Sequence, residues 1–362
     1  MFITNCDRNN FPTTITGLRA PSQSTRKKNM STNTNGKVAI ILPIFNTEQY
    51  LETCVRSILD QDYQNFEIYA VNDGSTDQSR SILQKLADFD TRIKIIDQAN
   101  GGLSNARNTA LDEIYKNSNY EYIAFVDSDD VITKRFLSEH ISRLEKDGTD
   151  VSVCGYARLY DSGKIKSNRK FETKKILSQE DFLKLVFTIN EWQSDGAAGG
   201  MVWKLVYRTS VIHGIKFIND RAYMDDEPFC IQVAKRASKF SYIAAPLYLY
   251  RQRPLPTSLS LQTGFKKRLI AGRRFCAQFS PKISQQANLI CTSAYVQAVI
   301  SYMKQYNDVP CDIAQYGEKI KEAHKQGLIN DKYYFLYRIF TKHPFCAKTY
   351  KAIRFFYLKL RH

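Results

Sequence analysis

The chain has 362 residues, 43% of them hydrophobic, so it is long enough to bury a full core without disulfide or metal support. No apolar run approaches the ~20 residues that a membrane-spanning helix needs, and residues 1–11 lack the apolar segment of a secretory signal. The eight cysteines are scattered without C-x-x-C spacing, which predicts reduced cytosolic thiols and argues against a disulfide framework or a zinc site.

The formal net charge of +16 is unevenly distributed along the chain. Residues 263–362 hold 18 Lys/Arg against 5 acidic residues, residues 1–36 hold 5 against 1, and the segment between them is almost neutral. A strongly basic C-terminal third indicates an anionic partner, and nucleic acid and a membrane surface are the two candidates.

Residues 1–36 are rich in Asn, Thr, Ser and Arg, and we expect a disordered tail because they hold too few apolar side chains to form a core. Met30 is an alternative start of the chain to Met1. After this tail, apolar runs predict buried strands at Val38–Phe45, Phe66–Val71, Ile93–Ile96 and Tyr122–Val126. Amphipathic segments predict helices between them, over about residues 50–59, 77–88 and 104–115.

This alternation implies an α/β fold with a mostly parallel sheet and helices on its faces. Further along, the pattern predicts helices over about residues 134–146, 178–187 and 225–237, strands over 151–156 and 242–250, and helices from Gly264 onward. Polar clusters follow three of the strands, at Phe45-Asn46, Asn72–Asp77 and Asp127–Asp130. Because ligands of such sheets bind at the carboxyl ends of the strands, we expect the three clusters to converge on one crevice.

The third cluster, DSDD, places Asp127, Asp129 and Asp130 directly after a buried strand. Carboxylates this close repel one another, and burying an unpaired one is unfavourable. A divalent cation such as Mg²⁺ or Mn²⁺ removes that penalty, since hard ions prefer oxygen ligands. The alternative is that DSDD only opens a turn or caps the helix that begins near Lys134.

The glycines before the third predicted helix have two interpretations. Gly101 and Gly102 can hold phosphate oxygens on their backbone N–H groups, and Arg107, one turn later, is either a phosphate clamp or a surface cation. The segment lacks a Walker lysine and the G-x-G-x-x-G spacing, so neither an NTPase P-loop nor a Rossmann dinucleotide site is supported.

A further acidic cluster, Asp225-Asp226-Glu227, precedes a predicted helix. It either caps the helix and complements its dipole or supplies a general base for a sugar hydroxyl. None of the five histidines lies in a catalytic context, and no G-x-S-x-G or H-E-x-x-H motif occurs.

Together these segments resemble the inverting glycosyltransferases of family 2, of the bacterial surface-polysaccharide type. The resemblance covers about residues 37–260, and it is carried by VAIILPIFNTEQYLETCVRSILDQDYQNFEIYAVNDGSTDQS, NGGLSNARNTAL, YIAFVDSDD, MVWKLVYR and DDEPF in that order. It implies a catalytic domain with the GT-A type nucleotide-diphospho-sugar transferase fold over residues 37–260, followed by a basic helical region over 261–362.

The resemblance also implies how the donor is bound. Pro43, Phe45 and Asn46 of PIFN would contact the nucleotide, with Phe45 stacked on uracil. Asp73 would accept the uracil N3–H, and Gly101 and Arg107 would line the nucleotide pocket.

In the same way, Asp127 would face the ribose and a Mg²⁺ or Mn²⁺ ion, Asp129 would ligate that ion, and Asp226 would be the catalytic base. The chain departs from the family pattern at Asn72, where Asp is common, and at Asp225, where Glu is usual. Residues 250–260 resemble the loop that closes on the donor, but the loop holds no histidine as a third protein ligand.

The implied reaction moves a sugar from a UDP-sugar to a hydroxyl of a glycan or a lipid-linked glycan. Residues 348–362 form a basic amphipathic segment with aromatics, which predicts either binding to an anionic membrane surface or packing on the catalytic domain. Membrane binding would make the protein peripheral on the inner face of the cytoplasmic membrane. A sugar nucleotidyltransferase would need a glycine-rich triphosphate loop that PIFNTEQY lacks, and no nucleic-acid module is recognisable, so no nucleic acid is expected. A non-catalytic member of the family is the remaining alternative.

Overall fold

A mixed ten-stranded sheet organises the described residues of this computed structural model, which are 36–116, 119–167, 176–187, 201–220, 224–253, 265–303 and 311–342. The strand order is β3-β2-β1-β4-β9-β6-β10-β5, with β7 paired to β6 and β8 to β10. The strands are β1 Val38–Ile44, β2 Phe66–Asp73, β3 Ile93–Gln98, β4 Tyr122–Phe125, β5 Val131–Ile132, β6 Val151–Tyr160, β7 Ile165–Lys166, β8 Ile176–Ser178, β9 Leu205–Arg208 and β10 Lys239–Gln252.

The prediction of a mostly parallel sheet holds for β1 to β4, whose mutual pairings are all parallel. β9 lies antiparallel to both β4 and β6, and β10 runs parallel to β6. The last paired residues of β1 and β4 are Ile41 and Phe125, so β1 continues beyond the end of its neighbour. Pro43 lies in this overhang, where its missing N–H removes no bond of the β1–β4 ladder.

The helices lie close to the predicted segments, although the short elements β5, β7, β8 and α6 were not predicted. They are α1 Glu48–Leu59, α2 Ser79–Phe89, α3 Leu103–Lys116, α4 Phe136–Asp147, α5 Gln179–Val186, α6 Thr209–Ile212, α7 Asp226–Arg236, α8 Phe265–Phe279, α9 Gln285–Met303, α10 Gly317–Lys325 and α11 Asp331–Lys342. The expected tail over residues 1–36 lies outside the described residues except for Gly36.

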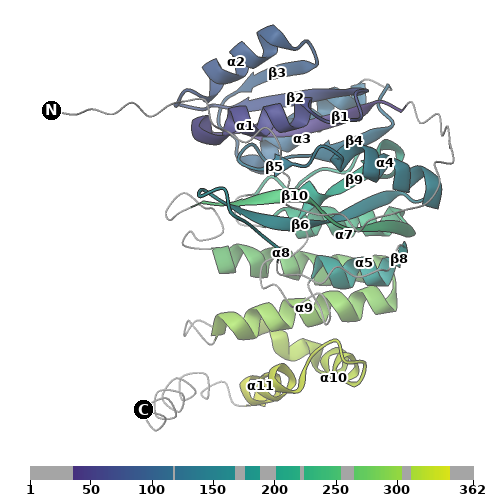
Figure 1. Cartoon of the computed structure of the whole chain (residues 1–362). Helices are drawn as coiled ribbons and strands as arrows, with labels where there is room; N and C mark the ends of the chain where they lie inside the picture. The colour runs from purple at the N-terminus through teal and green to yellow at the C-terminus, as the bar shows by residue number, and fades with distance from the viewer. Residues whose placement is uncertain are drawn as a thin grey trace. The chain divides into compact units, whose positions relative to one another are not determined.

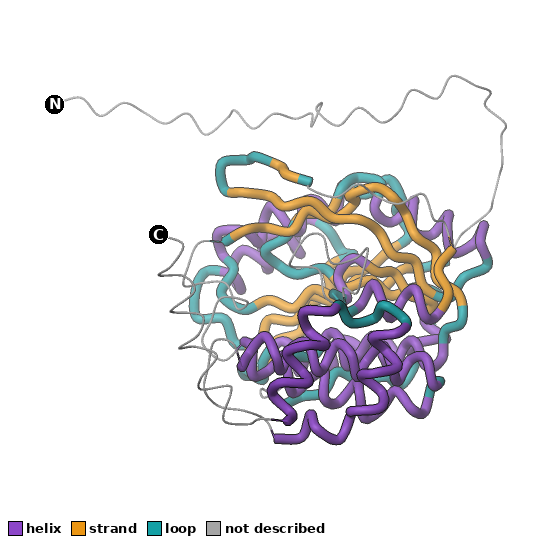
Figure 2. The backbone as a smooth tube through the Cα atoms, turned by 90° about the horizontal axis from the view of Figure 1, so that it is seen from below, coloured by secondary structure: helices purple, strands orange, loops and turns teal. Residues whose placement is uncertain are grey.

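Alternating side chains of β1 build two cores on opposite faces of the sheet. Ala39 and Ile41 belong to the cluster that includes the buried residues of α3, α5 and α7, whereas Val38, Ile40 and Leu42 belong to the cluster that includes those of α1, α2 and α4. Figure 1 shows α8 and α9 as further layers beneath the sheet, with α10 and α11 beyond them. Seen from below, helices lie in front of part of the sheet, while other strands stay in open view (Figure 2).

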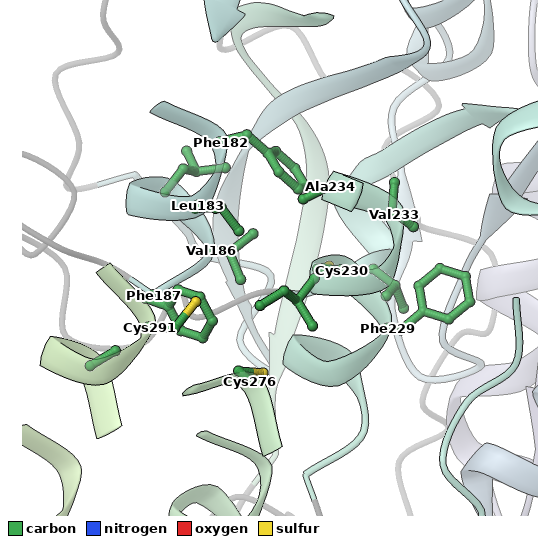
Figure 3. Close-up of a cluster of buried hydrophobic side chains, with 14 of the residues drawn as sticks. Phe182, Leu183, Val186, Phe187, Phe229, Cys230, Val233, Ala234, Cys276 and Cys291 are labelled. Atoms are coloured by element: carbon green, nitrogen blue, oxygen red, sulfur yellow. The ribbon is translucent and has the colours of Figure 1, made fainter. Parts of the chain in front are cut away.

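The helices α8 and α9 share one apolar core with α5 and α7. Figure 3 shows Phe182 and Phe187 near α5, Cys230 on α7, and Cys276 and Cys291 on the following helices, within one apolar cluster. Five cysteines of the described residues are free and buried, which confirms the predicted thiols for Cys54, Cys154, Cys230, Cys276 and Cys291. Within the described ranges, no helix has both the length and the hydropathy that crossing a membrane requires.

Candidate functional site

The first two polar clusters are joined by hydrogen bonds. Asn46 adopts a positive φ of 51° directly after β1, and its Oδ1 accepts from the backbone N–H of Thr76 at 2.8 Å. The backbone N–H of Asn46 donates to the Ser75 hydroxyl at 3.2 Å. On the same loop, Phe45 leaves 47% of its surface exposed although β1 itself is buried. The ends of β1 and β2 therefore form one structure that presents a large aromatic ring to solvent.

Asp73, the last residue of β2, is buried and fixes the loop before α3. Its two oxygens accept from the backbone N–H groups of Gly101 and Gly102, each at 2.8 Å, and Oδ1 also accepts from Gln98 Nε2 at 2.7 Å. The N–H groups of Gly101 and Gly102, which we expected to bind phosphate oxygens, thus donate to the Asp73 carboxylate instead. Gly74, with φ +69°, has no room for a side chain, because a Cβ would lie 2.9 Å from the Asn100 backbone nitrogen.

The DSDD turn is bound to both α1 and β10. Cys54 Sγ of α1 donates to the Asp127 carbonyl at 3.4 Å. Asp130 is fully buried; it accepts from the Tyr248 hydroxyl at 2.8 Å and from the Arg251 backbone N–H at 2.7 Å. The Tyr248 hydroxyl also accepts from the Asp127 backbone N–H at 3.1 Å. Burial, with added repulsion from Asp129, raises the pKa of Asp130 well above its usual range. Asp130 therefore holds the turn in place.

Asp129 is paired with the end of β10. Arg253 donates from Nε to Asp129 Oδ2 at 2.5 Å, and Arg251 Nε donates to the Asp129 carbonyl at 2.7 Å. Both guanidinium groups lie over the ring of Tyr50 in α1, at 4.9 Å for Arg251 and 5.6 Å for Arg253. Two cations therefore lie beside the predicted metal ligand, and the remainder of the predicted closing loop, residues 254–260, is outside the described residues.

Arg107 connects the acidic clusters through α3. Its side chain is 1% exposed, so the surface-cation interpretation is wrong. Nη2 donates to Asp127 Oδ1 at 2.9 Å and Nη1 donates to Asp226 Oδ1 at 2.7 Å, with Asp225 Oδ2 at 3.7 Å from Nη1. Burial by itself lowers the pKa of Arg107, but the three carboxylates outweigh it and raise that pKa. One buried cation thus holds Asp127 and Asp226 together, although about a hundred residues separate them.

Asp226 is the first residue of α7 and has an unusual acidity. Burial, with added repulsion from Asp225 and Asp127, raises its pKa to about 7 against the opposing pull of Arg107. Asp225 is the N-cap residue, but it makes no side-chain cap bond; it accepts from Ser104 Oγ at 2.6 Å instead. Pro228 lies in the first turn, where its missing N–H has no intrahelical partner to lose. Helix capping therefore explains why the acidic cluster lies at the start of α7. It does not explain why Asp225 and Asp226 bond to Ser104 and Arg107.

The carboxylates of Asp127 and Asp129, which follow β4, are the kind of oxygen ligand that a hard cation prefers. They would supply two protein ligands rather than three. Asp127 Oδ1 faces Arg107 and Asp129 Oδ2 faces Arg253, and the other oxygen of each has no hydrogen-bond partner among the described residues. Burial, with repulsion from Asp129, raises the pKa of Asp127 against the pull of Arg107. No group of three or more His, Cys, Asp or Glu side chains in the described ranges is arranged to hold a metal. Mg²⁺ is commonly held by one or two carboxylates together with substrate phosphates, so two ligands are sufficient.

Several contributors to the site were missed by reasoning from the sequence. Tyr248 lies inside a strand pattern, and Ser104 resembles an ordinary helix-start residue. Glu227 was grouped with its acidic neighbours, although its partner is Arg273 of α8 at 2.9 Å. The sequence offered one sign of these contributors, the two arginines at residues 251 and 253, directly after the last predicted strand.

Comparison with known proteins covers the first part of the described site, up to residue 202, in the family match. The family described as Glycosyl transferase family 2 matches residues 39–202. The putative glycosyltransferase EpsH of Bacillus subtilis is 34% identical over 59% of this chain, and the match spans 60% of the length of EpsH. The glycosyltransferase GlyG of Streptococcus pneumoniae is 30% identical over 68% of this chain and 79% of its own length.

Among solved structures, TarS of S. aureus, residues 1–349, is similar with a TM-score of 0.59 at 19% identity, over 84% of this chain and 86% of TarS. A second TarS crystal structure, in complex with UDP-GlcNAc, has a TM-score of 0.55 at 18% identity, over 84% of this chain and 92% of that one. At these identities the likeness concerns the fold.

Proposed function

Because this chain belongs to glycosyltransferase family 2, we propose that it transfers a sugar from a UDP-sugar to a hydroxyl group of a glycan acceptor, with inversion at the anomeric carbon. Its fold is the GT-A type, as the sequence predicted. One observation carries the proposal: the partly buried Asp226 is joined through the buried Arg107 to Asp127, just after β4. A carboxylate able to take a proton and a carboxylate suited to a cation thus share one arginine.

Asp226 is proposed as the general base. It would accept the proton of the acceptor hydroxyl as that oxygen attacks C1 of the sugar, opposite the departing UDP. A base works best when its pKa lies near the working pH, and burial brings the pKa of Asp226 to about 7. Such a base contributes about 10²–10⁴ in rate. A single displacement without a covalent intermediate inverts the anomeric configuration.

The uridine would bind at the ends of β1 and β2. Phe45 offers an exposed ring for stacking on a base, an arrangement that the buried strand before it does not require. A carboxylate has about four lone-pair sites, and Asp73 uses three of them for Gly101, Gly102 and Gln98, which leaves one for the uracil N3–H. Pro43 and Asn46 would shape this end of the site, and Arg107 would lie beneath the diphosphate.

Asp127 and Asp129 would hold Mg²⁺ or Mn²⁺ through their oxygens that face no protein donor. Bound there with the diphosphate, the ion would act as a Lewis acid that offsets charge on the departing UDP. Asp130, Tyr248 and Arg251 would keep the turn rigid while this happens.

The acceptor is proposed to be a glycan or lipid-linked glycan of a bacterial surface polysaccharide. The basic C-terminal third, 18 Lys/Arg against 5 acidic residues, supports peripheral binding at the inner face of the cytoplasmic membrane. The segment over 348–362 that would lie on the membrane is outside the described residues. Flotation of the full chain with anionic but not with neutral vesicles is the expected result.

The decisive experiment replaces the base. A thermal-shift panel of UDP-sugars with Mn²⁺ identifies the donor, and transfer is then measured for Asp226→Asn. We expect a loss of at least about 10²-fold with UDP affinity retained. Asp112→Asn is the matched control, since this exposed carboxylate of α3 pairs only with Lys216 in the described part of the chain. Transfer that survives in Asp226→Asn at the wild-type rate would overturn the assignment.

A further inference from the structure

The proposed base is held from two opposite directions. Its three-residue acidic segment sends each carboxylate to a different partner: Asp225 to Ser104 and Asp226 to Arg107, both of α3, and Glu227 to Arg273 of α8. The contacts to α3 belong to the site already described. The contact to α8 is separate from those contacts, and like Asp226 itself it lies outside residues 39–202 of the family match.

The Glu227–Arg273 pair is buried and has several hydrogen bonds. Arg273 Nε lies 3.2 Å and 3.1 Å from the two Glu227 oxygens, and Nη2 donates to Oε1 at 2.9 Å. Arg273 also donates from Nη1 to the Ala294 carbonyl of α9 at 3.3 Å, and its guanidinium lies 5.9 Å from the Phe187 ring centre beside α5. Burial lowers the pKa of Arg273, but Glu227 outweighs this and raises it. Because Arg273 is also held by α9 and by Phe187, it restricts where the Glu227 side chain can lie.

The backbone of α8 also approaches the segment directly. Met224, two residues before Asp226, donates its backbone N–H to the Arg268 carbonyl at 3.1 Å. A Cβ on Gly272 would lie 2.8 Å from the Met224 carbonyl oxygen, so only glycine permits this approach. One turn further along, Cys230 of α7 and Cys276 of α8 lie in the same apolar cluster (Figure 3). Backbone contact, ion pair and core packing thus all fix the start of α7 against α8.

We infer that Arg273 is a positioning residue for Asp226, which it orients toward Arg107 through Glu227, with Gly272 permitting the close packing. The inference rests on the proposed function, because it takes Asp226 as the base. It assigns a catalytic requirement to α8, which lies in the C-terminal region. Arg273 touches no reacting atom in this scheme. It holds Glu227, and through Glu227 it affects the position of Asp226.

The test uses the full chain and four variants. In Glu227→Met/Arg273→Met both charges are removed, so no unpaired buried charge opposes folding. Arg273→Met removes one partner, and Arg273→Lys keeps the charge but not the bidentate geometry. Arg208→Met is the matched control, because Arg208 also pairs with a glutamate, Glu145 at 2.6 Å, on the far side of β9 from the base. The kcat and donor KM are measured with the UDP-sugar that wild type turns over, and UDP affinity by calorimetry, below every unfolding midpoint.

We expect the double variant to bind UDP as wild type does, with donor KM unchanged and kcat lower by about 10²-fold, the scale of a misplaced catalytic group. Arg273→Lys should recover part of kcat, and Arg208→Met should keep all of it. A double variant with wild-type kcat, or a loss expressed in KM alone, would overturn the inference. If the base assignment itself is wrong, Asp226→Asn keeps its transfer activity; if only the positioning is wrong, Asp226→Asn is inactive while the Arg273 variants are active.

Discussion

Arg107 and Asp226 form a 2.7 Å ion pair between the first half of α3 and the first residue of α7, although 119 residues separate them in sequence. Since the same guanidinium also pairs with Asp127, removing it would leave two carboxylates facing each other in a buried space. This one side chain balances the charge of the carboxylates and holds the pKa of Asp226 below the value that burial alone would give it.

Arg107→Gln is expected to lower the free energy of unfolding by about 3–5 kcal/mol, the cost of leaving buried charge unpaired. Transfer at pH 7 should fall too, because loss of the cation raises the pKa of Asp226 further. Urea denaturation and a transfer assay measure the two effects. Arg107→Lys should recover part of the stability, and a Gln variant as stable as wild type would contradict the charge-balance argument.

The pH dependence follows from Asp226. Its protonated form takes no proton, so kcat/KM should fall as the pH drops below about 7, where burial places its pKa. Stability should change in the opposite direction. Between about pH 4 and 7 the folded protein keeps a proton that the unfolded chain has lost, so this group's contribution to the free energy of unfolding declines as pH rises. A flat rate profile from pH 5 to 8 would exclude Asp226 as the base.

Phe45→Ala is expected to weaken UDP binding by about 1–3 kcal/mol, the range found for stacking an aromatic on a base. Phe89→Ala is the matched control, since Phe89 is 91% exposed at the end of α2 and has no assigned role. Isothermal calorimetry with UDP measures both. Equal affinities of the two variants would remove Phe45 from the nucleotide site.

Much of the fold was predictable because strands and helices alternate with strong periodicity over residues 38–125. The antiparallel strand β9 was not, since a run as short as LVYR gives no sign of the strand's direction. In the site, the strand-end rule predicted which polar clusters lie near one another. It did not predict that Asp73 would occupy the amides of Gly101 and Gly102, because a turn-forming carboxylate and a free ligand look alike in sequence.

The proposed cation can be tested apart from activity. Mn²⁺ affinity, measured by electron paramagnetic resonance with UDP present, should fall by at least about tenfold in Asp129→Asn, the scale on which ligand surroundings act. Asp60→Asn, at an exposed position beyond α1, should bind as wild type does. Chelation with EDTA should stop transfer, and added Mn²⁺ should restore it. Transfer that persists in EDTA would rule out a required cation.

Gly74 and Gly148 both have positive φ angles, +69° and +58°, but only Gly74 is crowded. Gly148→Ala should cost about 1–2 kcal/mol, the penalty of the left-handed conformation for an L-residue. Gly74→Ala should cost more, because its Cβ would meet the Asn100 backbone at 2.9 Å. Thermal unfolding of both variants separates the cost of the positive φ from the cost of the steric clash. Equal losses of stability would show that the loop near Asn100 can move away from the added Cβ.

The overhang of β1 past β4 determines how the segments that follow the two strands can be arranged. β1 runs three residues beyond Ile41, the last residue paired with β4, which at ~3.3 Å per residue offsets the two ends by about 10 Å. The overhang does not separate the two segments, because the Thr47 hydroxyl, two residues after Phe45, donates to the Ser128 hydroxyl of the acidic turn at 3.1 Å. The unpaired end of β1 therefore leaves space for the turn after β4 to fold against the segment that carries the aromatic ring.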